Sequence, residues 1–310
     1  MNVFFVTFQR LITLFILMLS GYFMRRMKII DEETTSKISG MIIKFIVPVL
    51  IINSLNIEYS SELMKNGIKF FFAMIFIHIF ALFISYIVIK ILNIKKIIAG
   101  IWIYICMFSN GTFMGFPVLS YVFGEEALFF GSVAFIVFNL VSFSLGVEII
   151  AIMSDKKRKD TSLKSLIITP SNIAFLIGLI LFITPLSFPS PIIDAMDIIA
   201  DLTTPLSMIV IGSHIVKNSI LDLFSDWTAY VCFFMRLIIL PILNLILFKF
   251  IGFNYYMAGV AVLITAMPAS AMAPSIAEEY GGDAVWASKV VFLTTLGCIV
   301  TVPIINMFIV

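Results

Sequence analysis

The chain has 310 residues, of which 61% are hydrophobic and 12% are charged, and its formal net charge is +2. Soluble globular proteins contain about 45–50% apolar and about 25% charged residues, so this composition excludes that class and predicts a polytopic membrane protein. The small net charge, with basic residues clustered beside apolar stretches, also argues against a protein that binds nucleic acid.

Ten apolar stretches are long enough to cross about 30 Å of hydrocarbon as helices. Arg25, Arg26 and Lys28 follow the first stretch, whereas basic residues precede the apolar run of a signal peptide, so we expect a retained helix. The fold class expected is all-α, with two five-helix halves at 1–155 and 156–310 and a charged segment, 153–164, between them. The ten helices are expected at 3–24, 38–56, 67–92, 97–121, 127–152, 165–185, 193–215, 227–249, 255–279 and 284–308.

Basic residues are distributed unequally between the expected connections. Thirteen lie in connections on one side of the membrane, and three, Lys65, Lys69 and Lys249, lie on the other. Because cytoplasmic connections carry the excess of Lys and Arg, both termini are expected outside a plasma (cytoplasmic) membrane. Five helices in each half would make the second half run inverted relative to the first.

The two halves are related by a repeat with a single offset of 157 residues. Two homologous halves explain several landmarks at one offset better than chance does. The matching pairs are Gly21 with Gly178, Pro48 with Pro205, Pro117 with Pro274, and the segment 123–128 with 280–285.

The segment Asn110–Pro117 lies midway through the fourth expected helix and contains two glycines and a proline. Glycine lowers helix stability and proline removes a backbone hydrogen bond, so the segment predicts an interruption at bilayer depth. The ninth helix carries a counterpart at 268–274. Open backbone is tolerated there only inside protein or around a cavity, and paired breaks of this kind are typical of secondary transporters.

These segments resemble the auxin efflux carrier family. The resemblance rests on Asn110–Pro117 followed by Phe123–Ala127, and on Pro268 and Pro274 in the matching helix. It implies a five-plus-five inverted repeat in which helices four and nine cross at prolines, and a scaffold domain that moves against a transport domain. Bacterial members look like permeases for malate and other carboxylates, and bile acid sodium symporters are similar in architecture. The chain departs from the plant members in lacking a long central hydrophilic loop, which argues against auxin as the substrate.

The two breaks form the expected substrate site. The side-chain amide of Asn110 could donate to a carboxylate, and free backbone N–H groups at the start of the second half-helix add a partial positive charge. Alternatively, Asn110 caps that half-helix, and Gly111 with Gly115 forms a GxxxG motif that packs two helices closely. The substrate-binding residues expected are Ser109, Asn110, Gly111, Gly115, Pro117, Met267, Pro268, Ala269, Ser270 and Pro274.

Three further residues are candidates for charge or ion coupling. Lys289 in the tenth helix would neutralise an anionic substrate or occupy a cation position, or else it extends to the inner surface. Its counterpart in the repeat is Ser132. His78 in the third helix would relay protons or would form a hydrogen bond between helices. Other ionisable residues in the expected spans are Lys44, Glu148, His214 and Arg236.

The function expected from these patterns is secondary active transport of a small organic anion by alternating access, without sodium and with proton coupling left open. The alternatives are a sodium-coupled symporter or a channel of the same fold. An intramembrane enzyme ranks last, because HExxH and GxSxG in a suitable context, paired catalytic aspartates and an ATP-binding loop are missing. Cys106, Cys232 and Cys298 are isolated, so no metal or other cofactor is expected. The expected partners are the substrate and membrane lipid, and a homodimer stays open.

Overall fold

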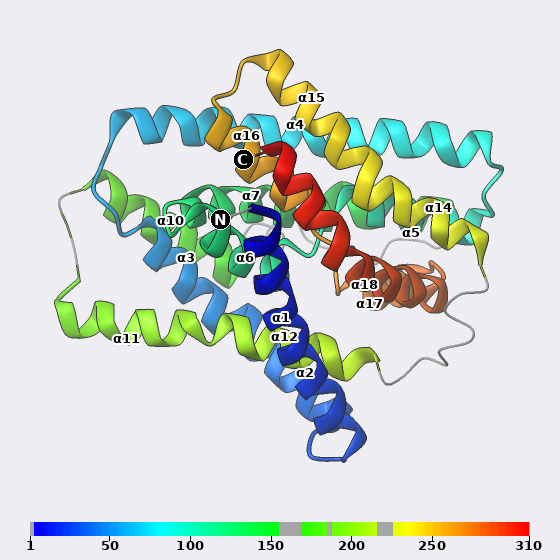
Figure 1. Cartoon of the computed structure of the whole chain (residues 1–310), viewed down its shortest axis with the longest axis horizontal. Helices are drawn as coiled ribbons and strands as arrows, with labels where there is room; N and C mark the ends of the chain where they lie inside the picture. The colour runs from blue at the N-terminus through cyan, green and yellow to red at the C-terminus, as the bar shows by residue number, and fades with distance from the viewer. Residues whose placement is uncertain (1–2, 155–168, 185, 187, 216–225, 310) are drawn as a thin grey trace.

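The structure is a computed structural model that describes residues 3–154, 169–184, 186, 188–215 and 226–309, and its regular elements there are helices (Figure 1). Four of them, η1 to η4, are single π-helical turns. In chain order the elements are α1 (Val3–Arg26), α2 (Glu32–Met41), η1 (Ile42–Ile46), α3 (Val47–Leu55), α4 (Ser61–Ile91), α5 (Lys96–Met107), η2 (Gly111–Gly115), α6 (Phe116–Phe123), α7 (Ala127–Val141), η3 (Ser142–Gly146), α8 (Val147–Met153), α10 (Pro170–Ile183), α11 (Ser190–Asp201), α12 (Thr203–Ile215), α14 (Trp227–Phe234), η4 (Met235–Ile239), α15 (Leu240–Ile251), α16 (Tyr255–Ala266), α17 (Ala273–Tyr280) and α18 (Ala284–Ile309).

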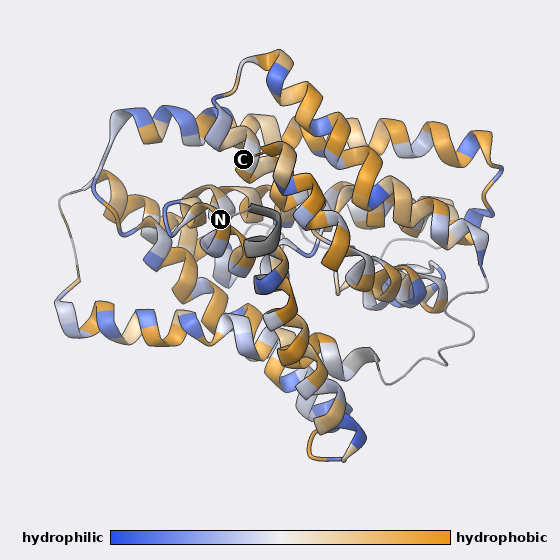
Figure 2. Ribbon diagram, viewed as in Figure 1, coloured by the Kyte–Doolittle hydropathy of each residue, from blue (hydrophilic) through white to orange (hydrophobic). Residues whose placement is uncertain are grey.

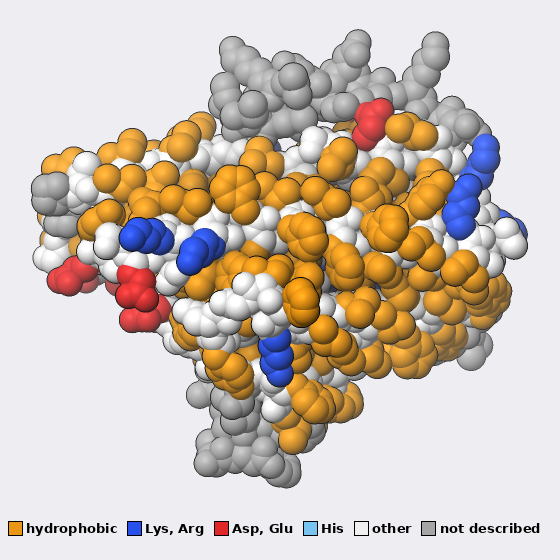
Figure 3. All heavy atoms as spheres, turned by 90° about the horizontal axis from the view of Figure 1, so that it is seen from above, with side chains coloured by type: hydrophobic (Ala, Val, Ile, Leu, Met, Phe, Trp, Pro, Cys, Tyr) orange, Lys and Arg blue, Asp and Glu red, His pale blue; other side chains and the backbone are white. Residues whose placement is uncertain are grey.

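Among the described residues, six helical stretches are long and apolar enough to cross a membrane. In α4, hydrophilic residues gather at the two ends and apolar residues fill the length between them (Figure 2). The face in Figure 3 is covered mainly by hydrophobic side chains, and large apolar residues such as Phe250, 92% exposed, and Ile91, 71% exposed, project outward. The protein is therefore a helical, multi-pass membrane protein whose apolar exterior suits lipid. The count of ten spans, the inverted repeat and the orientation of the termini stay predictions.

Two helices begin about six residues earlier than expected. Asp31 caps α2 by accepting a hydrogen bond from the Thr34 amide, and Ser60 caps α4 by accepting one from the Leu63 amide. Both caps precede polar turns, so the helix extends beyond the apolar run from which its start was predicted. The expected segment 153–164 lies outside the described residues from 155 onward.

Prolines follow three of the four π-helical turns, whereas η3 has none after it and Pro303 lies inside α18 without such a turn. The turns η1, η2 and η4 each end two residues before a proline, Pro48, Pro117 and Pro241 respectively. A proline ring clashes with the carbonyl four residues earlier, and a wider turn relieves that clash. The helix expected at 193–215 corresponds to the apolar helical stretch Ser190–Ser213, which is long enough to cross a membrane. A turn at Leu202, three residues before Pro205, divides it into α11 and α12.

The helices form two packed groups. In the first, α1 packs against α12 and α10 packs against α3, with α11 beside α3 and α12; the second contains α4, α5, α7, α8 and α14 to α18 (Figure 1). Glycines make the closest contacts in the first group: Gly21 lies against the Ile209 backbone, and Gly178 against Ile52 and Leu55. The groups meet where α1 packs on α18, α3 on α7 and α12 on η2.

Candidate functional site

Two helices are interrupted beside the glycine and proline segments from which breaks were predicted. The first interruption lies earlier than expected, because residues 111–117 are helical in η2 and α6. Helix α5 ends at Met107, Phe108 is extended, and the helix resumes at η2. Helix α16 ends at Ala266, Met267 is extended, and the helix resumes at α17. We call the non-helical segments 108–110 and 267–272 the first and second break.

The two breaks cross as a short antiparallel pair. The backbone amide of Asn110 donates to the Pro268 carbonyl at 2.8 Å, and the backbone amide of Ser270 donates to the Phe108 carbonyl at 3.2 Å. Ser109 lies opposite Ala269. The Ala269 amide donates in turn to the Thr294 hydroxyl of α18 at 3.1 Å. Backbone groups that lose their helical partners are thus satisfied inside the protein, which open backbone at membrane depth requires.

Polar side chains from both breaks line one cavity of about 440 Å³, which we call the crossing cavity. Its polar lining combines amides and hydroxyls, which can bind a carboxylate by donating hydrogen bonds. The rest of its wall is largely aromatic. The polar residues are Ser109, Asn110, Thr112, Asn139 and Ser270, and the others are Ile43, Phe113, Phe135, Phe138, Phe143, Ala271 and Met272.

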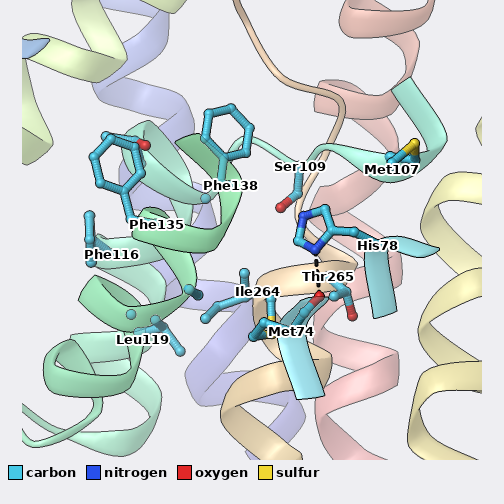
Figure 4. A pocket seen from close by; sticks show the side chains of 14 residues that line it. Met74, His78, Met107, Ser109, Phe116, Leu119, Phe135, Phe138, Ile264 and Thr265 are labelled. Carbon is cyan, nitrogen blue, oxygen red and sulfur yellow. Dashed lines mark hydrogen bonds between the residues drawn. The ribbon is translucent and has the colours of Figure 1, made fainter. Parts of the chain in front are cut away.

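A second cavity of about 450 Å³ lies on the other side of the first break and shares Ser109 and Thr112 with the crossing cavity. We call it the His78 cavity (Figure 4). The His78 ring is buried and its Nδ1 lies 2.6 Å from the Met74 carbonyl oxygen. Because a carbonyl only accepts, Nδ1 carries the proton and Nε2 is the acceptor. Figure 4 shows that ring edge on the side of Ser109.

A larger cavity of about 1400 Å³ separates α3, α6 and the α11–α12 pair, and we call it the vestibule. Four carboxylates line it: Glu125, Glu126, Asp197 and Asp201. Asp197 accepts a hydrogen bond from the Asn53 amide nitrogen at 2.6 Å, so the acidic residues of α11 face the protein as well as solvent.

The predicted site residues are distributed over these features. The crossing cavity is lined by Ser109, Asn110 and Ser270, and Gly111 lines the His78 cavity. Pro117 lines the vestibule. Met267, Pro268 and Ala269 form the second break, Gly115 ends η2 opposite Met267, and Pro274 is the second residue of α17.

Two alternative roles can be compared with the geometry. The Asn110 side chain forms no capping hydrogen bond, although the residue precedes the resumed helix. A Cβ built on Gly111 would lie no closer than 3.7 Å to a neighbouring atom, and one on Gly115 no closer than 3.6 Å. Both are ordinary contact distances, so close helix packing does not require these two glycines.

The charged and coupling candidates are not all at the crossing. Lys289 is half-buried in α18 and lines none of the three cavities, and its coupling role stays a prediction. The Ser132 hydroxyl shares a hydrogen bond of 2.7 Å with Ser54, which joins α7 to α3. Within the described ranges, no three His, Cys, Asp or Glu residues are grouped to hold a metal.

Sequence reasoning missed several polar residues of the site. Thr112 lies inside the Asn110–Pro117 motif but was not selected, and the only signal of Asn139 and Thr294 is a polar side chain within an apolar segment. Arg236 was noted but given no role, and it is 2% exposed, with its Nη1 donating to the Cys106 carbonyl at 3.0 Å.

Residues 6–162 and 156–306 match the model of the family described as membrane transport protein. The chain belongs to this family. It is the auxin efflux carrier family that the Asn110–Pro117 motif resembles, so that prediction is confirmed. This family member is therefore a transport protein rather than an enzyme.

Two curated relatives of this membrane transport protein cover nearly its whole length. An uncharacterized transporter of Methanocaldococcus jannaschii is 25% identical over 90% of this chain and 91% of its own length. An uncharacterized transporter of Methanothermobacter thermautotrophicus is 23% identical over 96% of each chain.

Proposed function

We propose that this membrane transport protein is a secondary active transporter of a small organic anion, a carboxylate, that works by alternating access around the two breaks. The observation that carries the proposal is the hydrogen-bonded crossing of the breaks beside a cavity lined by Asn110, Ser109 and Ser270. Unwound segments that cross near the bilayer midplane are the common build of substrate sites in such transporters.

Side chains and backbone would bind the carboxylate together. The Asn110 amide nitrogen and the hydroxyls of Ser109 and Ser270 can donate to its oxygens, and they line one cavity. The helix resumes immediately after each break, so the positive ends of η2–α6 and α17 lie at the crossing. Such an end stabilises a nearby anion by about 0.3–1 kcal/mol, and by up to ~2 kcal/mol when partly buried.

Paired contacts support the inverted repeat that alternating access would use. Gly21 packs on Ile209, and Gly178 packs on Ile52. The two glycines are 157 residues apart, and so are the two isoleucines. The repeat offset therefore relates the first contact to the second. The starts of α6 and α17, and of α7 and α18, are also 157 residues apart.

Transport is proposed to be independent of sodium, with His78 or Lys289 available to carry a coupled proton. One observation favours the sodium-coupled alternative: four carboxylates line the vestibule. Uptake into proteoliposomes separates the two. Replacing sodium by choline should leave the rate unchanged, and strict dependence on sodium would establish the alternative.

A thermal-shift screen of the purified protein tests the substrate class. The panel is acetate, lactate, succinate and malate, because a ligand that binds only the folded state raises its stability, by about 2.7 kcal/mol at 100 times Kd. At least one member should raise the unfolding temperature. A panel without effect would contradict carboxylate transport.

The same assay tests the role of Asn110. Asn110→Ala should weaken binding of the panel anion by about 10- to 100-fold, because a hydrogen bond to a charged group contributes about 1.5–3 kcal/mol. Asn244→Ala is the matched control, since Asn244 is buried in α15 and lines none of the cavities. Equal affinities in the two variants would remove Asn110 from the binding site.

A further inference from the structure

A buried cation without an acidic partner lies next to the crossing. Arg236 is in η4, and its side chain is among the largest that are fully buried. Among the described residues, Nε and Nη2 have no hydrogen-bond partner, and no carboxylate forms an ion pair with the guanidinium. Arginine stays protonated in proteins, and removing an unpaired charge from water is costly, so this group needs an explanation.

Within the part of the chain that the structure describes, one hydrogen bond of the guanidinium marks where its charge acts. It goes to the Cys106 carbonyl, in the last turn of α5. In a continuous helix that carbonyl would accept from the backbone amide of Asn110, but this amide donates to the Pro268 carbonyl of the second break. Arg236 therefore satisfies a carbonyl that the first break leaves open.

This position changes the electrostatics of the crossing. Two half-helices end there, α5 and α16, and two begin there, η2–α6 and α17. The C-terminal ends carry partial negative charge and the N-terminal ends partial positive charge. A guanidinium at the end of α5 offsets one negative end, which leaves the crossing with an excess of positive potential. Because Cys106, Met107 and Phe108 are buried in an apolar cluster, that potential is weakly screened.

The neighbouring cavities are within reach of this field. Met107, the residue after Cys106, lines the His78 cavity, and Ser109 lines both that cavity and the crossing cavity. Lys289, the cation that the sequence pointed to, lines neither. Arg236 lines neither cavity itself, and its charge acts on the crossing through the Cys106 carbonyl at the end of α5.

We propose that Arg236 is a positioning residue that holds the end of α5 at the crossing and supplies the fixed positive charge that balances one carboxylate of the substrate. The proposal rests on carboxylate transport as argued above. It assigns to Arg236 the preference of the site for a carboxylate over a neutral molecule of the same shape.

The test compares three carboxylates of the panel with their amides: acetate with acetamide, lactate with lactamide and succinate with succinamide. Affinities come from thermal shifts of the purified full chain. Arg236→Gln should lower the ratio of carboxylate to amide affinity by about 10- to 100-fold. Lys249→Gln removes the same charge from the exposed end of α15, outside the three cavities, and is the matched control, which should keep the wild-type ratio.

A purely structural role would give a different result. If Arg236 only held the α5 end, Arg236→Gln would unfold at lower temperature while the ratio stayed at the wild-type value, and the proposal would be overturned. A wild type that binds no carboxylate would instead overturn the proposed function itself.

Arg236→Lys keeps the test decisive if the glutamine variant does not fold. A lysine ammonium loses its proton as the pH rises toward about 10.4, and at lower pH when it is buried, whereas arginine keeps its charge. Carboxylate affinity should therefore fall with pH in this variant and stay constant in the wild type. His78, Cys106 and Cys232 are the titratable groups that face position 236, and both proteins contain them. Parallel pH profiles would overturn the proposal.

Discussion

Two regions of this molecule bring backbone segments from distant parts of the chain into close contact, and they do so in different ways. Between α1 and α12 both helices are continuous, and Gly21 and Gly212 let them touch: a Cβ on Gly212 would lie 1.8 Å from the Met18 carbonyl oxygen. At the crossing the contact is made by unwound backbone and hydrogen bonds, and the glycines there have room for a methyl group. In the first region glycine lets two helices pack closely, and in the second it leaves the backbone free to unwind. Substitutions of these glycines should therefore affect stability in the first region and transport in the second.

The largest effect is expected for Gly212→Ala. The added methyl would overlap the backbone of α1, which cannot move aside as a side chain does, so the helices must separate. We expect a loss of stability at or above the upper end of the about 1–3 kcal/mol typical of overpacking. Thermal unfolding in detergent measures it. Gly40→Ala is the control, since a Cβ there meets nothing within 4 Å. Equal unfolding temperatures of the two variants would show that α1 and α12 are not held at this distance.

An intermediate effect is expected at the crossing for Thr294→Val. Valine keeps the shape but removes the hydroxyl that accepts from the buried Ala269 amide, and an unsatisfied buried amide costs about 1–3 kcal/mol. Thr295→Val is the matched control, because that hydroxyl bonds only within its own helix, to Val291. The same unfolding assay should separate the two variants, and a larger loss at Thr295 would contradict the role of Thr294 in supporting the second break.

The smallest effect on stability is expected for Gly111→Ala. The nearest atoms to the new methyl would be 3.7 Å away, and alanine restricts the unfolded chain, so stability should stay the same or rise by up to about 1 kcal/mol. Counterflow of the panel anion in proteoliposomes should nevertheless slow, because the turn after the first break becomes stiffer. A fall in unfolding temperature like that of Gly212→Ala would return Gly111 to a packing role. Unchanged counterflow would show that Gly111 takes no part in the conformational change of transport.

The sequence predicted both breaks because glycine and proline act locally, through the hydrogen bonds and torsion angles of their own neighbours. It could not predict that Asn110 pairs with Pro268, since that contact depends on how the two helices cross. The turn at Leu202 was not predicted, although Pro205 follows it, because the surrounding residues are apolar enough for one span, which α11 and α12 together still form. The role of Arg236 was not predicted either, because a single charge in an apolar run does not indicate which carbonyl it will contact.

The crossing also constrains how the protein is made. The amide of Asn110 obtains its partner from Pro268, and the carbonyl of Phe108 obtains its partner from Ser270, so the first break is completed by residues that are synthesised about 160 positions later. At ~5–20 residues per second, that interval lasts roughly 10–30 s. Throughout it the nascent first half needs water or the insertion machinery to satisfy its open backbone, and a chain truncated before the second break would keep unpaired peptide groups inside the membrane.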